Sequence, residues 1–274
     1  MTTKKLPRVL AHLVVLFGAL WTLLPLYWMV ITSLKPSSEV YEYPPTFWPH
    51  GVSMEGFIEA WTHGGGRGVQ DSIIIAVGTL LISLAFGLPT AYSISRFRTG
   101  GDNLSFTVLS FRFMPPIAPA VAFWLISTRL HVFDTHMLLI FVNSMASIPF
   151  VVWIMKGFID EIPYAIEEAA QIDGASWLKV VRDHILPLAA PGVVAVSLFV
   201  IVFTWNEFLF ATLLTGLRVL PFPKAVPGLT IGVYEPDWGA VSALGMMVAV
   251  PIVLLSFYMQ KYIVRGMTYG AVRQ

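Results

Sequence analysis

The chain has 274 residues, of which 56% are hydrophobic and only 12% are charged, and its mean hydropathy is +0.74. A soluble domain carries about 25% charged residues, so this composition excludes an ordinary soluble enzyme. The net charge of +1 gives no global basic field for nucleic acid, and the absence of cysteine excludes disulfide frameworks and thiolate metal sites.

Six apolar stretches are each long enough to cross a hydrocarbon core of about 30 Å. Barrel strands are about 10 residues long and alternate in polarity, whereas these stretches are longer and apolar on every face. The predicted fold class is therefore an all-α membrane protein, with residues 1–274 forming one transmembrane domain. We expect the six helices at about 9–34, 72–95, 105–128, 137–155, 188–214 and 239–260.

The first stretch follows Lys4, Lys5 and Arg8, as the core of a cleaved signal peptide would. Its apolar run covers residues 9–34, however, which is well beyond the roughly 7–15 residues of a signal-peptide core. We therefore expect a retained transmembrane helix.

The distribution of Lys and Arg predicts the orientation, because cytoplasmic connections carry the excess of positive charge. With a cytoplasmic N-terminus, eleven of these residues lie inside, five lie outside and Arg112 lies within a span. The five outside are Lys35, Arg67, Arg129, Arg218 and Lys224, and the eleven inside are Lys4, Lys5, Arg8, Arg96, Arg98, Lys156, Lys179, Arg182, Lys261, Arg265 and Arg273. We therefore expect both termini in the cytoplasm.

Two outside connections have distinctive compositions. Residues 35–71 are rich in proline and aromatic residues, which indicates either an aromatic belt at the membrane surface or a docking surface for an external partner. Residues 215–238 carry four prolines and three glycines, so we expect turns rather than helix there. The residues concerned are Tyr41, Tyr43, Pro44, Pro45, Phe47, Trp48 and Pro49 in the first connection, and Gly216, Pro221, Pro223, Pro227, Gly228, Gly232 and Pro236 in the second.

The third stretch contains Pro115, Pro116 and Pro119. Proline lacks a backbone N–H and clashes with the preceding turn, so these residues should interrupt the helix. The carbonyls that they free must be satisfied by a cavity or by neighbouring helices.

Two charged residues lie within the expected spans, where charge is costly and usually functional. Arg112 is about seven residues, or roughly 10 Å, from the cytoplasmic end of its span, and Glu207 is about 19 residues, or roughly 28 Å, from the same side. This depth difference argues against a direct ion pair. We expect Arg112 near an inner vestibule or snorkelling to the membrane surface, and Glu207 with Asn206 near the outer part of a pathway, unless these are packing groups that face another subunit. Weaker pathway candidates are Met114, Pro115, Pro116 and Asn143.

The largest cytoplasmic connection, residues 156–187, carries helical signals. Pro163 suits the first turn of a helix, Gly174 suits a left-handed helix end, and Ser176 can cap a second helix. Small and apolar residues recur at helical spacing, which predicts a helix–turn–helix elbow with an apolar face. Such an elbow suits either the membrane surface or the groove of another protein. The recurring residues are Ala165, Ala169 and Ile172, with Ile162 and Ile166 beside them.

The elbow resembles the EAA loop of binding-protein-dependent ABC importer permeases. The matching run is Glu168-Ala169-Ala170-Gln171-Ile172-Asp173-Gly174-Ala175, followed by Leu186-Pro187-Leu188. One departure is His184, where that family usually has an aliphatic residue. Three further runs are similar to the maltose-type carbohydrate permeases: Met114-Pro115-Pro116, Trp205-Asn206-Glu207-Phe208, and the ending Val264-Arg265-Gly266-Met267-Thr268-Tyr269-Gly270-Ala271-Val272.

The resemblance implies a permease domain in which the elbow seats in a cleft of a separate ATPase subunit. It implies four kinds of partner: a second homologous permease, an ATPase dimer, an extracytoplasmic substrate-binding protein, and a sugar, polyol or sugar derivative as substrate. It also implies an inner-membrane location. The residues that carry over to the coupling role are Glu168, Ala169, Ala170, Asp173, Gly174, Leu186 and Pro187.

The sequence has no G-x-x-x-x-G-K-[ST] motif, since the glycines at 64–66 and 68 precede Val69 and Gln70. We therefore expect no catalytic activity and no cofactor in this chain, with ATP and Mg²⁺ bound by the partner ATPase. An ion-coupled secondary transporter is the alternative. It would need intramembrane acidic or cationic sites, for which Glu207 is the one acid in a predicted span.

Overall fold

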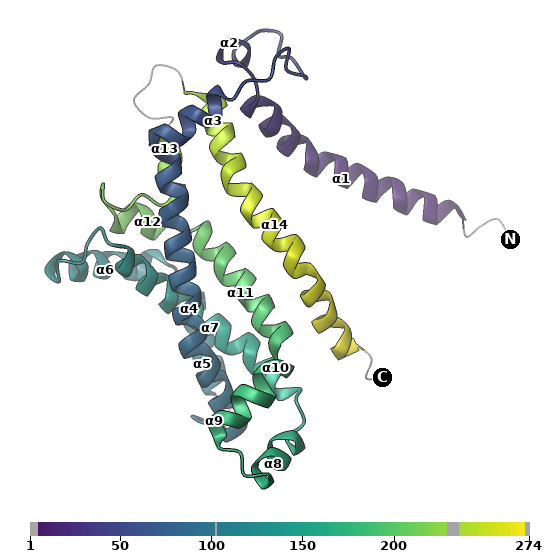
Figure 1. The fold of residues 1–274 in the computed structure, drawn as a ribbon, viewed down its shortest axis with the longest axis vertical. Coiled ribbons are helices and arrows are strands. Elements are labelled where there is room, and N and C mark those ends of the chain that lie inside the picture. The colour runs from purple at the N-terminus through teal and green to yellow at the C-terminus, as the bar shows by residue number, and fades with distance from the viewer. Residues whose placement is uncertain (1–4, 102, 229–235, 272–274) are drawn as a thin grey trace. The chain divides into compact units, whose positions relative to one another are not determined.

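The computed structural model describes residues 5–101, 103–228 and 236–271, and all regular elements in these ranges are helices (Figure 1). The predicted all-α class is therefore confirmed over the described residues. They form two compact units, Met1–Arg67 with Ala225–Val250 and Gly68–Lys224 with Pro251–Gln274. The ending from Val264 to Val272 has its backbone described to Ala271, and its side chains lie outside the described residues.

Four described helices are long and apolar enough to cross a membrane, or six if each of two bent pairs counts as one span. The four agree with the predicted spans at 9–34, 72–95, 137–155 and 239–260. The corresponding helices are α1 (Lys5–Ser33), α4 (Gly66–Phe97), α7 (His136–Asp160) and α14 (Trp238–Ala271).

The first unit contains α1, two short helices of the connection that follows it and the beginning of α14. These short helices are α2 (Ser37–Val40) and α3 (Glu55–Ala60). The π-helical turn η1 (Trp61–Gly65) joins α3 to α4. The backbones of α3 and α14 approach so closely that a Cβ at Gly56 would lie 2.8 Å from the carbonyl oxygen of Gly239. Glycine at position 56 therefore allows this contact.

The second unit is built on α4, α7 and α11 (Ala190–Trp205), which share one apolar core. A Cβ at Gly87 of α4 would lie 2.5 Å from a methyl carbon of Val151 of α7, so glycine lets these two helices approach closely. Small residues serve this purpose in membrane helices, where close van der Waals packing drives association. The buried core residues include Ala91, Tyr92, Val151, Met155, Ile159, Val196 and Val200.

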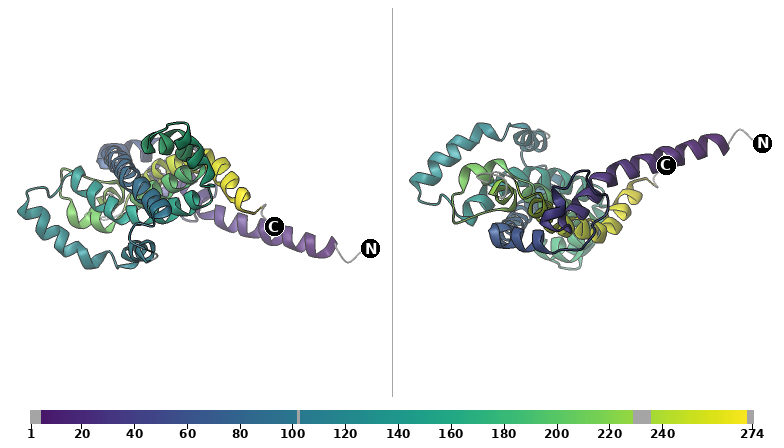
Figure 2. Two further views of the ribbon diagram at one scale, coloured as in Figure 1. Left: turned by 90° about the horizontal axis from the view of Figure 1, so that it is seen from below. Right: turned by 90° about the horizontal axis from the view of Figure 1, so that it is seen from above.

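The third predicted span is interrupted, as its prolines predict. Helix α5 (Leu104–Ser110) and the turn η2 (Phe111–Phe113) end before Met114, and α6 (Ile117–Arg129) begins after Pro116. The two halves are bent by 85°, and α6 runs at a steep angle to α5 (Figures 1 and 2). Pro119 does not break α6, because it lies in the first turn, where a backbone N–H has no intrahelical partner.

The fifth predicted span, 188–214, is not one helix. Helix α11 ends at Trp205, and three residues separate it from α12 (Leu209–Leu214). The 16 residues of α11 are about 24 Å long, which is shorter than a hydrocarbon core of about 30 Å. The composition of residues 188–214 stays apolar through the break, so the sequence alone predicts one continuous helix there.

The connection after α12 is also more helical than predicted. Residues Phe222–Gly228 form α13, although turns were expected. Pro223 is the second residue of this helix, a position in which the missing N–H costs nothing. The expectation for residues 229–235, which include Gly232, lies outside the described residues.

Candidate functional site

Residues 165–188 form the predicted helix–turn–helix elbow at one end of the second unit (Figure 1). Its first helix is α8 (Ala165–Ile172). Its second arm runs through α9 (Trp177–Val180), the wide turn η3 (Val181–Ile185) and α10 (Leu186–Leu188). The second arm then bends by 76° into α11.

The turn between the two arms is a helix end of the Schellman type. The Gly174 N–H donates to the carbonyl of Gln171 at 2.9 Å, and the Ala175 N–H donates to the carbonyl of Ala170 at 3.0 Å. Gly174 has φ +83°, a left-handed conformation that a Cβ disfavours. The predicted role of Gly174 in ending α8 is therefore confirmed. Ser176 occupies the cap position of α9, but its side chain makes no capping hydrogen bond.

The two faces of α8 differ in exposure. Ala165, Ala169 and Ile172 are exposed, and Ile172 keeps 86% of its surface accessible. On the opposite side Ala170 is buried and Ile166 packs against the apolar core of α4, α7 and α11. The elbow thus presents an apolar stripe that the described part of the chain leaves uncovered.

The residues expected to contact an ATPase fall on both faces. Glu168, Ala169, Asp173, Gly174 and Pro187 are exposed, and Leu186 is half-buried. Ala170 is the exception, because only 6% of its surface is accessible and it belongs to the core. Its small side chain lets α8 pack closely on the unit.

A buried ion pair joins the elbow to α4. Glu167, which is fully buried, accepts a hydrogen bond from the Arg96 guanidinium and another from the Tyr92 hydroxyl at 2.7 Å. Arg96 also donates to the carbonyl of Ile162 at 2.8 Å. Sequence reasoning missed this role, because Glu167 and Arg96 are 71 residues apart and no local pattern connects them.

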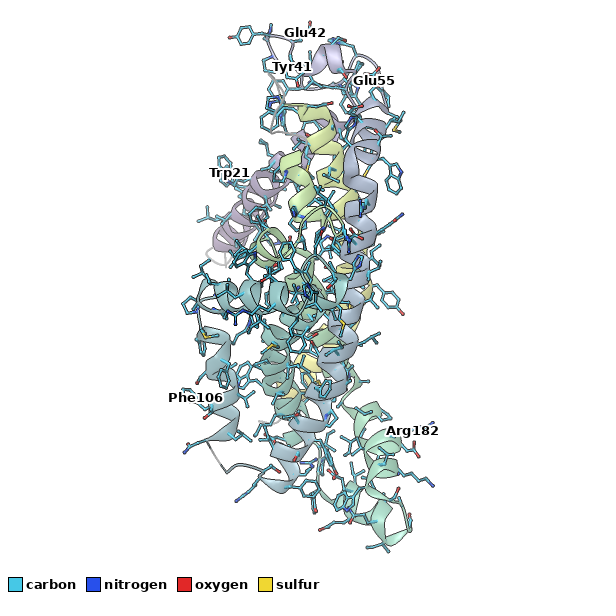
Figure 3. All side chains as sticks on the ribbon, turned by 90° about the vertical axis from the view of Figure 1, so that its left-hand side faces the viewer. Trp21, Tyr41, Glu42, Glu55, Phe106 and Arg182 are labelled. Atoms are coloured by element: carbon cyan, nitrogen blue, oxygen red, sulfur yellow. The ribbon has the colours of Figure 1, made fainter. Side chains whose placement is uncertain are left out.

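Aromatic and polar contacts extend the attachment. The rings of Phe97 in α4 and Trp177 in α9 meet edge to face, with centroids 5.3 Å apart. A separate contact joins α7 to α4 beside the elbow: Asp160 at the end of α7 accepts hydrogen bonds from Ser95 of α4 and from Lys156. Arg182 lies instead on the outer surface of the elbow, with 83% of its side chain exposed (Figure 3). The elbow therefore packs against its unit on one side and is exposed on the other.

The two charged residues of the predicted spans have separate partners. The Arg112 guanidinium lies 5.0 Å from the ring centroid of Phe203 in α11. Glu207 accepts hydrogen bonds from the N–H groups of Phe210 at 2.9 Å and Ala211 at 3.0 Å, so it caps α12.

The depth difference predicted from the sequence assumes a straight third span, which the structure does not have. Phe203 lies one helical turn before Glu207, and the bend after η2 invalidates a depth counted along a straight third helix. A depth counted along a straight helix therefore does not apply to Arg112, and separate roles for Arg112 and Glu207 stay a prediction.

The remaining pathway candidates lie in different elements of the second unit. Asn206 is exposed and its amide donates to the carbonyl of Val202 in its own helix at 2.8 Å. Asn143 is buried in α7, whereas Met114 and Pro115 are exposed at the bend between η2 and α6.

A polar network outside the spans orders the connection after α12. Asp134 accepts hydrogen bonds from the N–H groups of Arg218 at 2.8 Å and Val219 at 3.0 Å. Burial would raise the pKa of Asp134, but these backbone hydrogen bonds outweigh it and lower the pKa. Asp71 accepts from Leu220 N–H at 2.8 Å and contacts the His136 ring at 2.7 Å. Sequence reasoning named none of these three residues as positioning groups.

Known proteins with similar sequences are transport components. A family model described as "Binding-protein-dependent transport system inner membrane component" matches residues 72–269. A probable ABC transporter permease protein, y4oR, of Sinorhizobium fredii is 33% identical, with 99% of this chain and 97% of the relative covered. The trehalose/maltose transport system permease protein MalG of Thermococcus litoralis is 30% identical, with 100% and 99% covered. The trehalose transport system permease protein SugB of Mycobacterium tuberculosis is also 30% identical, with 92% and 93% covered.

Solved structures share the fold. A chain of a bacterial ABC transporter involved in the import of the acidic polysaccharide alginate superposes with a TM-score of 0.81 at 20% identity, covering 96% of this chain and 98% of that one. A chain of the MetNI methionine ABC transporter gives a TM-score of 0.59 at 18% identity, covering 77% and 98%. The family match excludes the alternative of an ion-coupled secondary transporter. The chain belongs to the family of inner-membrane permease components of binding-protein-dependent ABC transporters.

Proposed function

We propose that the chain is the permease subunit of an ATP-driven importer of sugars or sugar derivatives, in which it forms half of the translocation pathway. The sugar class rests on the relatives named for trehalose and maltose transport. The other half of the pathway comes from a second homologous permease. A soluble binding protein on the outside delivers the substrate.

The observation that carries the coupling role is the uncovered face of α8. Ala165, Ala169 and Ile172 recur at helical spacing and form one contiguous exposed apolar stripe, and contiguous apolar patches mark interaction sites. Glu168 and Asp173 flank this stripe with two exposed carboxylates. The surface therefore suits a partner cleft with an apolar floor and cationic or donor-rich walls, which we assign to the ATPase subunit.

The proposed mechanism follows from the attachment of the elbow. ATP and Mg²⁺ bind the ATPase dimer, which closes and displaces the two elbows seated in it. The elbow transmits this displacement to α4 through the Arg96–Glu167 pair and to α11 through its second arm. The helices of the two permeases then switch from an inward-open to an outward-open arrangement.

The proposed topology has six spans in one permease domain, with α5 and α6 together crossing once, α11 and α12 together crossing once, and both termini in the cytoplasm. The elbow and the basic end of α4 then face the ATPase. The connection ordered by Asp134 and Asp71 faces outwards, where it can contact the binding protein.

The test is ATP hydrolysis by the complete transporter in liposomes, with and without liganded binding protein. In Glu168→Lys, charge reversal should remove the stimulation by binding protein, because losing a desolvated charge pair costs about 2–5 kcal/mol. Gly174→Val should have the same effect, because the left-handed conformation costs a non-glycine residue about 1–2 kcal/mol and tilts the elbow.

Two matched controls accompany these variants. Glu161→Lys reverses an exposed charge just before the elbow, and Gly174→Asn places a residue that tolerates φ > 0 at the turn. Both should retain stimulation and uptake. Normal stimulation in Glu168→Lys and Gly174→Val, with the subunit inserted and assembled, would show that α8 is not the coupling element.

A further inference from the structure

The outside connection of the first unit folds back along α1. The Tyr27 hydroxyl donates a hydrogen bond to the carbonyl of Phe47, and the Trp28 and Phe47 rings meet edge to face with centroids 5.8 Å apart. Tyr27 and Trp28 lie six and five residues before Ser33, the last residue of α1, which corresponds to about 7–9 Å along the helix. Phe47 therefore lies beside the last turns of a membrane-spanning helix and not beyond its end.

Two charged residues of this connection, Lys35 and Glu39, are buried. Glu39 and Lys35 have only 6% and 4% of their surfaces accessible. Glu39 accepts hydrogen bonds from the Thr46 hydroxyl and from the His50 N–H. Lys35 donates to the carbonyl of Thr46 at 2.7 Å, and its ammonium group lies 5.3 Å from the Trp28 ring centroid. These contacts fix the connection against the end of α1.

The outward surface is aromatic. The accessible fractions of Tyr43, Phe47 and Trp48 are 92%, 70% and 74%, and residues 43–49 contain no charged side chain. An exposed titratable residue flanks this segment at each end: Glu42, which is labelled in Figure 3, precedes it and His50 follows it. An apolar segment between two hydrated ends matches the polarity profile of a membrane–water interface.

The backbone of the segment also suits an interface. Non-helical backbone near lipid leaves N–H groups without partners, which is costly. Pro44, Pro45 and Pro49 carry no N–H, so three of the seven residues from 43 to 49 remove that cost.

We propose that residues 43–49 lie in the headgroup layer of the membrane as an aromatic anchor, with Tyr43, Phe47 and Trp48 in contact with lipid. The occupant of this surface is lipid and not a soluble partner, because the segment returns to the depth of Tyr27 and Trp28 within α1. The window of α1 that defines its span is apolar and has no residue buried within the chain. The anchor is independent of the substrate class and of the role of α8.

The test uses single cysteines, which are unique labelling sites within this chain because its sequence has none, with the partner subunits in cysteine-free form. Trp48→Cys and Tyr43→Cys carry an environment-sensitive fluorophore in the complete transporter, reconstituted in phosphatidylethanolamine and phosphatidylglycerol liposomes. Val52→Cys is the matched control, since Val52 is 73% exposed but lies beyond His50. One quencher is a nitroxide near the lipid headgroup, and the other is aqueous iodide.

We expect lipid nitroxide to quench the labels at 43 and 48 several-fold more than the label at 52, and iodide to show the reverse order. Equal iodide quenching at 48 and 52, with little quenching by the lipid nitroxide, would overturn the proposal. Protection of position 48 from iodide only after addition of the binding protein would also overturn it, in favour of a protein-docking surface.

Discussion

The buried Arg96–Glu167 pair should determine how tightly the elbow is held on α4. In Glu167→Gln the carboxylate charge is lost while the side-chain shape is kept, so Arg96 remains buried at 8% side-chain exposure without its counter-charge. Breaking a buried pair by removing one partner costs about 3–5 kcal/mol. Because each 1.4 kcal/mol is a factor of ten, local opening of the elbow should become roughly 10²–10³ times more frequent.

The assay is amide hydrogen exchange of peptides from residues 162–185 in the complete transporter held in lipid nanodiscs. Exchange in Glu167→Gln should accelerate by that factor, while peptides from α7 remain protected. Glu168→Gln is the matched control: the neighbouring carboxylate is exposed, so exchange should stay unchanged even where coupling to the ATPase is weakened.

A double variant separates the charge from the packing. Arg96→Met with Glu167→Met removes both charges, and replacing a buried pair by apolar residues of similar volume is often neutral or stabilising. Exchange should then return towards the wild-type rate. Unchanged exchange in Glu167→Gln would refute the reasoning, because it would mean that other contacts hold the elbow.

Three further predictions concern the outside and the spans. A cysteine at Val52 should react with an impermeant thiol reagent in intact cells, whereas cysteines at Thr3 and Gln274 should not; the opposite pattern would reverse the topology. Glu207→Ala should cost about 0.5–2 kcal/mol of local stability through loss of the α12 cap, and its effect should add to that of Arg112→Ala within about 0.5 kcal/mol. Mutual rescue in the double variant would instead reveal an ion pair. The pKa of Asp134 is lowered in the folded protein, so its contribution to stability is fully present above the ordinary pKa of about 3.9 and is lost only as the pH falls through the lower folded value. The protection of residues 216–220 against hydrogen exchange should therefore be constant from pH 7 to 5. Asp134→Asn should reduce that protection at pH 7, as measured by exchange of residues 216–220.

Features encoded by neighbouring residues were predictable. Apolar runs predicted the four long helices, and Pro115 with Pro116 predicted the bend in the third span. Gly174 predicted the end of α8, because a left-handed residue is a local requirement. Helical spacing alone predicts that Ala165, Ala169 and Ile172 share one face of α8.

Features that depend on tertiary contacts were not predictable in this way. The Arg96–Glu167 pair joins segments 71 residues apart, and Arg96 counted in the sequence only as one cytoplasmic positive charge. The break between α11 and α12 has a local signal in the sequence, which the pathway interpretation of Glu207 does not use. Glu207 precedes Phe210 by three residues, which is the spacing of a helix cap, but a carboxylate in an apolar run first indicates a pathway residue.

The length of α8 explains why adjacent glutamates have opposite environments. A helix of eight residues is marginal in water, so α8 depends on contacts with the rest of its unit. Successive residues on a helix are rotated by about 100°, which directs Glu167 towards α4 and Glu168 towards solvent. The inner carboxylate can therefore fix the helix while the outer one remains available to a partner. Variants at position 167 should change elbow opening first and coupling second, whereas variants at position 168 should change coupling alone.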